Sequence, residues 1–153
     1  MWMQMGRIVG IIGGILALVG TFLPWATIES NIESLSASGI ALFIVGVPVL
    51  LFGIIGLILV ALPKRGTAIG AFVMGILALI FVLLAFVLVG ILEGLVSGTD
   101  ISITYDYGMW VSLIGAILLM VGGIWAFVEL GKVPPAPAPM MPMEPPMEQP
   151  PME

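Results

Sequence analysis

The chain contains no cysteine and no histidine among its 153 residues. Without thiols or imidazoles it cannot form a disulfide, build a zinc or iron–sulfur site from those ligands, or use a thiol nucleophile or a histidine acid–base catalyst. Its four basic residues are too few for the basic patch that binds phosphate backbones, so nucleic acid is not expected as a partner.

Charge is scarce as well. Charged residues make up 8% of the chain, against about a quarter in a soluble domain. Hydrophobic residues make up 61% and gather in four long runs. Each run is long enough to cross a bilayer core, which takes about 20 residues. The sequence predicts an all-α integral membrane protein, an antiparallel bundle of four transmembrane helices embedded in the lipid bilayer, with spans near residues 7–25, 39–62, 67–92 and 108–130.

The first run, 7–25, also has the positive residue and apolar core of a signal peptide. A cleavage site with small residues should then follow, and Leu23-Pro24-Trp25-Ala26 is a poor one. An uncleaved first transmembrane helix is therefore the preferred interpretation.

The basic residues indicate which ends of the spans share a side. When the loops are assigned alternately to the two sides, every basic residue falls on one side, and the loops on the other side carry acidic residues. Positive residues near span ends are retained in the cytoplasm. We therefore predict a multi-pass cell-membrane protein with both termini cytoplasmic, oriented by Arg7, Lys64, Arg65 and Lys132.

The two polar loops would then face outward. Residues 26–38 carry Ile28, Ile32 and Leu35 at helical spacing, which fits either a short amphipathic helix or a solvated connector. Residues 101–107 alternate apolar and polar side chains and predict a short strand. Aromatic residues at these loops are expected at the outer membrane interface, foremost Trp25, Tyr105 and Tyr107.

Glycine spacing predicts close helix packing. Small residues four apart let helix backbones approach, either inside the bundle, which we prefer, or against another chain. The residues predicted to pack in this way are Gly6, Gly10, Gly14, Gly66, Gly70, Gly115 and Gly122. The glycines of the second and fourth runs also match at one constant offset, which favours an internal duplication into two hairpins of the same orientation.

Two proline features complete the pattern. Pro48 lies inside the second run and should kink that helix, as a packing feature rather than a gate. Residues 133–153 are almost entirely Pro, Met, Ala and Glu, so they predict a disordered tail beyond a transmembrane domain of residues 1–132. The tail fits a linker or docking segment better than a weak Cu(I) site built from methionines.

The run Gly20-Thr21-Phe22-Leu23-Pro24-Trp25, followed by a serine-rich loop and Ser38-Gly39-Ile40, resembles small archaeal and actinobacterial four-span proteins of uncharacterised function. The layout is also remotely similar to claudin-like tetraspans, which carry a tryptophan in the first outer loop and a strand-forming outer face. Their Gly-Leu-Trp motif and cysteine pair are absent here, and the first loop is short. The resemblance implies no functional residues for this chain.

Membrane transport or catalysis normally needs polar or ionisable groups at depth, and the four runs place none there beyond a few hydroxyls. The sequence therefore predicts no enzyme, cofactor or metal site. It favours a structural or accessory subunit that packs with other membrane proteins or with itself. The alternative is a small transporter or permease for an uncharged or apolar solute.

Overall fold

The computed structural model describes residues 5–30 and 33–132. This part of the chain is mostly helical, with four helices long and apolar enough to cross a membrane and a small three-stranded sheet. The helices are α1 (Met5–Phe22), α2 (Phe43–Ala61), α3 (Arg65–Val96) and α4 (Tyr107–Gly131). The strands are β1 (Pro24–Ser30), β2 (Ser34–Ser38) and β3 (Ile101–Tyr105). The predicted tail, 133–153, lies outside the described residues.

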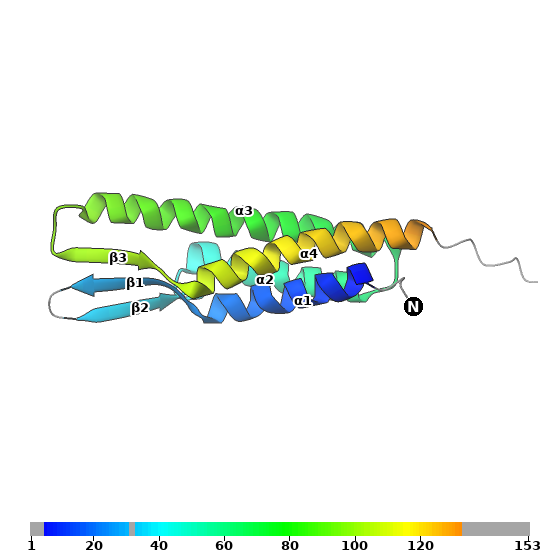
Figure 1. Ribbon diagram of the computed structural model, residues 1–153, viewed down its shortest axis with the longest axis horizontal. Helices are drawn as coiled ribbons and strands as arrows, with labels where there is room; N and C mark the ends of the chain where they lie inside the picture. The colour runs from blue at the N-terminus through cyan, green and yellow to red at the C-terminus, as the bar shows by residue number, and fades with distance from the viewer. Residues whose placement is uncertain (1–4, 31–32, 133–153) are drawn as a thin grey trace, which may run out of the picture.

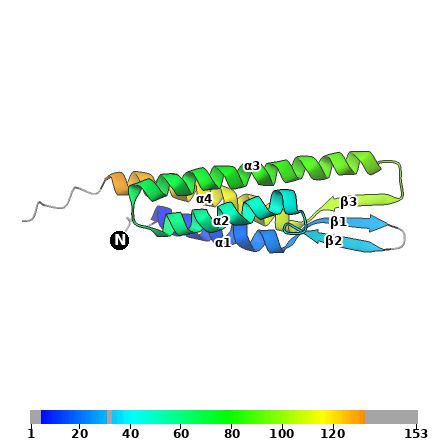
Figure 2. The ribbon, with the colours of Figure 1, turned by 180° about the vertical axis from the view of Figure 1, so that it is seen from behind.

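The helices form an elongated bundle with the sheet at one end (Figure 1). α1 and α3 run toward the sheet, and α2 and α4 run away from it, so neighbouring helices are antiparallel (Figures 1 and 2). α4 packs mainly on α1 and α3, and α2 packs mainly on α3 and α1. The short turn between α2 and α3 and the start of α1 both lie at the end opposite the sheet (Figure 2).

The first of the two polar loops differs from the prediction. Residues 24–38 form neither an amphipathic helix nor a plain connector but a β-hairpin, in which β1 pairs with β2. β1 pairs on its other side with β3, the strand that the alternation of residues 101–107 predicted correctly. The helical spacing gave the wrong prediction because β1 is stabilised by pairing with β2 on one side and, on the other, with a strand about 75 residues away, which no local pattern records.

α1 and α4 meet along a seam of small residues. On α1 the seam consists of Gly6, Gly10, Gly13, Ala17 and Gly20, and on α4 of Ser112, Gly115, Leu119, Gly122 and Ala126. The contacts run in one antiparallel register, from Gly6 against Ala126 to Gly20 against Ser112. Alternating steps of four and three residues keep both seams facing each other along the whole length, as in a coiled coil.

This seam places most of the predicted packing glycines inside the bundle. Gly6, Gly10, Gly115 and Gly122 lie on it, while Gly14 and Gly70 approach leucines of α2. Gly66 differs from the prediction: a methyl group there would meet no atom within 4 Å. It sits in the first turn of α3, where no neighbouring helix passes close to it. The stripe on the first span is therefore covered by α4 and α2 rather than left free for another chain.

α3 has 32 residues and is about 48 Å long, against a hydrocarbon core of about 30 Å. Its last turns therefore extend beyond the starts of α2 and α4 and run beside the sheet (Figure 1). The excess length of this span had predicted either tilt or such an extension. Pro48 lies within α2, where its missing N–H leaves the carbonyl of Ile44 without its helical donor.

Candidate functional site

Trp25 joins the sheet to the bundle. Its side chain is fully buried, and its indole N–H donates a hydrogen bond to the carbonyl of Gly20, at 2.7 Å. Gly39 lies against the ring, where a methyl group would come within 2.7 Å of Trp25 Nε1. The ring of Trp25 therefore packs inside the protein, whereas Tyr105 and Tyr107, which were predicted with it, are exposed. Gly39 is also not part of the second helix, which begins at Phe43.

Asp106 forms a second connection between the sheet and the bundle. Its backbone N–H donates to the carbonyl of Trp25 at 3.0 Å, and its carboxylate accepts a hydrogen bond from the hydroxyl of Thr27. Asp106 is also the residue that precedes α4. One residue therefore ties β1 to the start of α4 and fixes the sheet relative to the bundle.

The register of the strands gives the sheet two unlike faces. Ile28 lies opposite Leu35 on one side and opposite Ile103 on the other, so these three side chains form a row across one face, here called the outer apolar row. The opposite face is polar and carries Thr27, Glu29, Ser34, Ser36, Ser102 and Thr104. The sheet is therefore amphipathic.

α3 covers only one end of the outer apolar row. Ile103 is buried in a cluster with Val89, and Val96 packs against that cluster. Exposure rises along the row away from α3, from 9% at Ile103 to 36% at Ile28 and 67% at Leu35. Near the tip of α3, Leu95 is also uncovered, at 75% exposure. Apolar side chains thus remain uncovered beyond the starts of the other helices.

An aromatic cluster marks the base of the sheet. Phe86 of α3 stacks on Tyr105, with ring centroids 5.6 Å apart, and meets Trp110 edge-on at 5.1 Å. Tyr105, Tyr107 and Trp110 are all exposed. Tyrosine and tryptophan rings concentrate where a bilayer meets water. The exposed aromatic rings gather at the level where the bundle meets the sheet.

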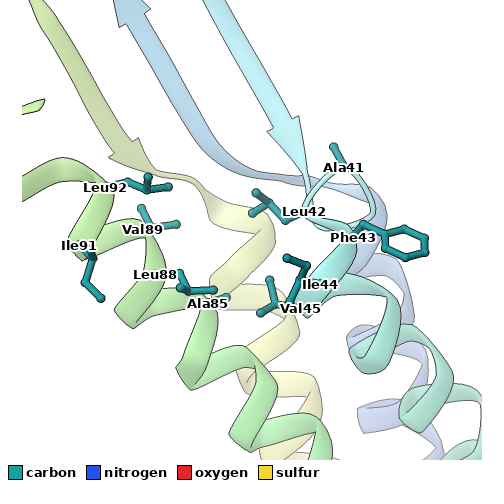
Figure 3. A pocket seen from close by; sticks show the side chains of 10 residues that line it. All are labelled: Ala41, Leu42, Phe43, Ile44, Val45, Ala85, Leu88, Val89, Ile91 and Leu92. Atoms are coloured by element: carbon teal, nitrogen blue, oxygen red, sulfur yellow. The ribbon is translucent and has the colours of Figure 1, made fainter. Parts of the chain in front are cut away.

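An apolar pocket of about 410 Å³ opens beside this level (Figure 3). One wall is the turn and first residues of α2, 41–45, and the other is the face of α3 that carries Ala85, Leu88, Val89, Ile91 and Leu92. Leu88, Leu92 and Leu42 point into the space between the two helices (Figure 3). A second, smaller hollow of about 220 Å³ lies between α3 and α4 and is lined by Ile69, Phe72, Ile124 and Phe127.

The opposite end of the bundle carries the basic residues. The guanidinium of Arg7 donates to the carbonyls of Val60, at 3.4 Å, and Ala61, at the end of α2. Arg65 lies over the ring of Phe127, 4.3 Å from its centroid. Lys64 and Lys132 are exposed. The four residues predicted to orient the protein are therefore gathered at one end, remote from the sheet (Figure 1).

Glu129 joins this end and was not singled out from the sequence. Its carboxylate accepts hydrogen bonds from the backbone N–H of Gly6, at 3.3 and 3.4 Å. The first N–H groups of a helix have no partner within the helix, and negative charge is favoured there. The sequence did contain a signal for this residue, because Glu129 is the single acidic residue in the otherwise uncharged run 108–130.

Few polar side chains are buried inside the described part of the bundle. The buried polar side chains are Thr21, whose hydroxyl donates to the carbonyl of Leu18, and Ser112, whose hydroxyl has no hydrogen-bond partner. Among residues 5–30 and 33–132, no group of three or more acidic side chains is placed to hold a metal ion. The described core of the bundle is therefore almost entirely apolar.

The chain matches no known protein-family model and no curated protein sequence. Three features of the described residues are candidate functional surfaces: the outer apolar row, the exposed tip of α3 and the pocket between α2 and α3.

Proposed function

We infer that the protein is a non-enzymatic accessory subunit of the cell membrane, which associates with other membrane proteins through its outer end. The observation that carries this proposal is the outer apolar row, whose Leu35 is 67% exposed on a sheet that extends beyond the ends of α1, α2 and α4 and lies beside the last turns of α3. Lipid chains cannot cover a surface outside the hydrocarbon core, and exposed apolar patches of this kind mark sites of protein association.

The orientation proposed with it places the sheet outside and both termini in the cytoplasm. The gathering of Arg7, Lys64, Arg65 and Lys132 at the end opposite the sheet supports this orientation, because basic residues near span ends are retained inside. The strand-forming outer face and the tryptophan at its base also support the proposed likeness to claudin-like tetraspans.

A small transporter or permease has less support. Solute passage through a bundle usually needs polar groups facing a cavity at depth. Here the described core is closed by glycine, alanine and valine, and the two pockets described above are apolar and lie at the side of the bundle. Glycine stripes are also less suited to hold a partner than the outer row, since they are covered within the chain.

Site-directed photo-crosslinking tests the accessory role. A photoreactive residue at Leu35 should form adducts with a membrane protein in intact cells, and one at Ser36, which points to the polar face, should not. Leu35→Asn should release that partner during gentle purification without changing the melting temperature of the bundle. Adducts formed only with a second copy would assign the row to self-association. A lone monomer with no adduct at Leu35 would refute the proposal.

A further inference from the structure

The pocket between α2 and α3 is not part of the surface proposed to associate with other membrane proteins. Its volume is about 410 Å³, within the range of about 300–1,000 Å³ that is usual for small-molecule sites. Its lining is entirely apolar side chains, and Val45, Ala85 and Val89 at its floor are buried parts of the core. We propose that this pocket holds one acyl chain of a phospholipid from the surrounding outer leaflet.

The chemistry of the lining selects the occupant. A peptide segment in extended form would bring N–H and C=O groups into a space whose side chains can neither donate nor accept a hydrogen bond, and such groups are costly to bury unpaired. Water would lose its partners in the same way. A hydrocarbon chain has no polar group to satisfy, so it loses nothing by entering.

The size of the pocket excludes a packed helix. A helix satisfies its own backbone but has a diameter of about 10–12 Å with side chains. α3 forms one wall of the hollow, and the start of α2 with the turn before it forms the other (Figure 3). A single flexible chain fits such a slot, whereas a third helix would rest only on its rim.

The pocket lies where acyl chains of the surrounding leaflet can reach it. Both walls of the pocket lie within predicted spans, since residues 41–45 belong to the span 39–62 and residues 85–92 to the span 67–92. Ile44 and Ile91 at the rim are exposed and continue the lipid-facing surface of the bundle. An acyl chain can therefore pass from the leaflet into the pocket without crossing water.

Photolabelling with a defined lipid tests this site. The full-length protein is placed in nanodiscs of phosphatidylcholine that carries a diazirine on one acyl chain, and the adducts are mapped after irradiation. Adducts should be enriched at least fivefold at residues 41–45 and 85–92 over the lipid-facing residues of α1, such as Ile12 and Ile15. An even spread over all lipid-facing residues would overturn the proposal.

Matched variants separate a bound chain from ordinary lipid contact. Leu88→Trp should fill the pocket and reduce the enrichment at least fivefold, while Leu83→Trp, on the same helix but outside the pocket, should leave it unchanged. Melting temperatures show whether each variant folds, and Leu92→Trp replaces Leu88→Trp if that variant does not. Enrichment that survives both pocket variants would refute the site, as would a cross-link between two copies in place of lipid adducts. The outcome of this test does not depend on whether a partner binds the outer apolar row.

Discussion

The indole N–H of Trp25 reaches back to the carbonyl of Gly20, five residues earlier, at 2.7 Å. This hydrogen bond crosses the point where α1 ends and β1 begins, and it is fully buried. The carbonyl of Gly20, near the end of α1, also accepts a hydrogen bond from the backbone N–H of Leu23 at 3.3 Å, so the tryptophan adds a second and shorter one. The bond therefore fixes the direction in which the chain leaves α1 and enters the sheet.

Trp25→Phe should lower the free energy of unfolding by about 0.5–1.5 kcal/mol, because it keeps much of the ring volume but loses the indole hydrogen bond to the carbonyl of Gly20, which retains its bond from Leu23. Trp25→Ala should lower it by about 3–5 kcal/mol, since it also opens a cavity. Thermal unfolding in detergent measures both. Trp110→Phe is the control: its ring is half exposed, so the change should stay within about 0.5 kcal/mol. Equal losses at both positions would contradict the anchoring role of Trp25.

Gly122→Ala tests the seam between α1 and α4. The added methyl group would overlap the backbone of Gly10, so the helices must separate, and overpacking of this kind typically lowers stability by about 1–3 kcal/mol. Gly66→Ala provides the matched control, because that position faces open space and alanine favours a helix over glycine by about 1 kcal/mol. The melting temperature should fall for Gly122→Ala and hold or rise for Gly66→Ala. The opposite order would show that the seam is not packed as described.

The helices were predictable because each carries its own signal. A run of about 20 uncharged apolar residues must cross a bilayer or be buried, so α2 and the main part of α3 follow from composition alone. β3 was predictable too, since the alternation of residues 101–105 is a local pattern. The glycine seam was found only in part: steps of four residues reveal Gly6 and Gly10, whereas Gly13 and Gly20 need the seven-residue repeat.

The candidate site could not be derived in this way because its parts meet only in three dimensions. The burial of Trp25 depends on the close approach of Gly39, which lies in the turn before α2. The outer apolar row depends on the register of β1 with both β2 and β3. The pocket depends on where α2 begins relative to the long α3. None of these offsets is set by hydropathy, which records only that each segment is apolar.

Arg7→Gln tests the polar contacts at the opposite end of the bundle. Arg7 donates to the carbonyls of Val60 and Ala61, which have no partner within α2, and a positive charge is favoured at a helix end. Its loss should lower the free energy of unfolding by about 1–2 kcal/mol. Arg7→Lys should restore only part of this, because an ammonium lacks the planar fork that reaches two acceptors. Lys132→Gln, at an exposed position, should change stability little. Full rescue by lysine would show that charge alone matters.

The orientation in the membrane can be measured with single cysteines, because the natural chain has none and each introduced thiol is a unique reporter. Ser36→Cys lies on the polar face of the sheet and Thr99→Cys in the turn before β3, both exposed, and both should react with a membrane-impermeant maleimide in intact cells. Gly66→Cys lies beside Arg65 at the basic end, in open space, and should react only after the membrane is permeabilised. Basic residues near span ends are retained in the cytoplasm, which is why the two ends should differ. Labelling of Gly66→Cys in intact cells, with Ser36→Cys protected, would reverse the proposed orientation and place the outer apolar row inside the cell.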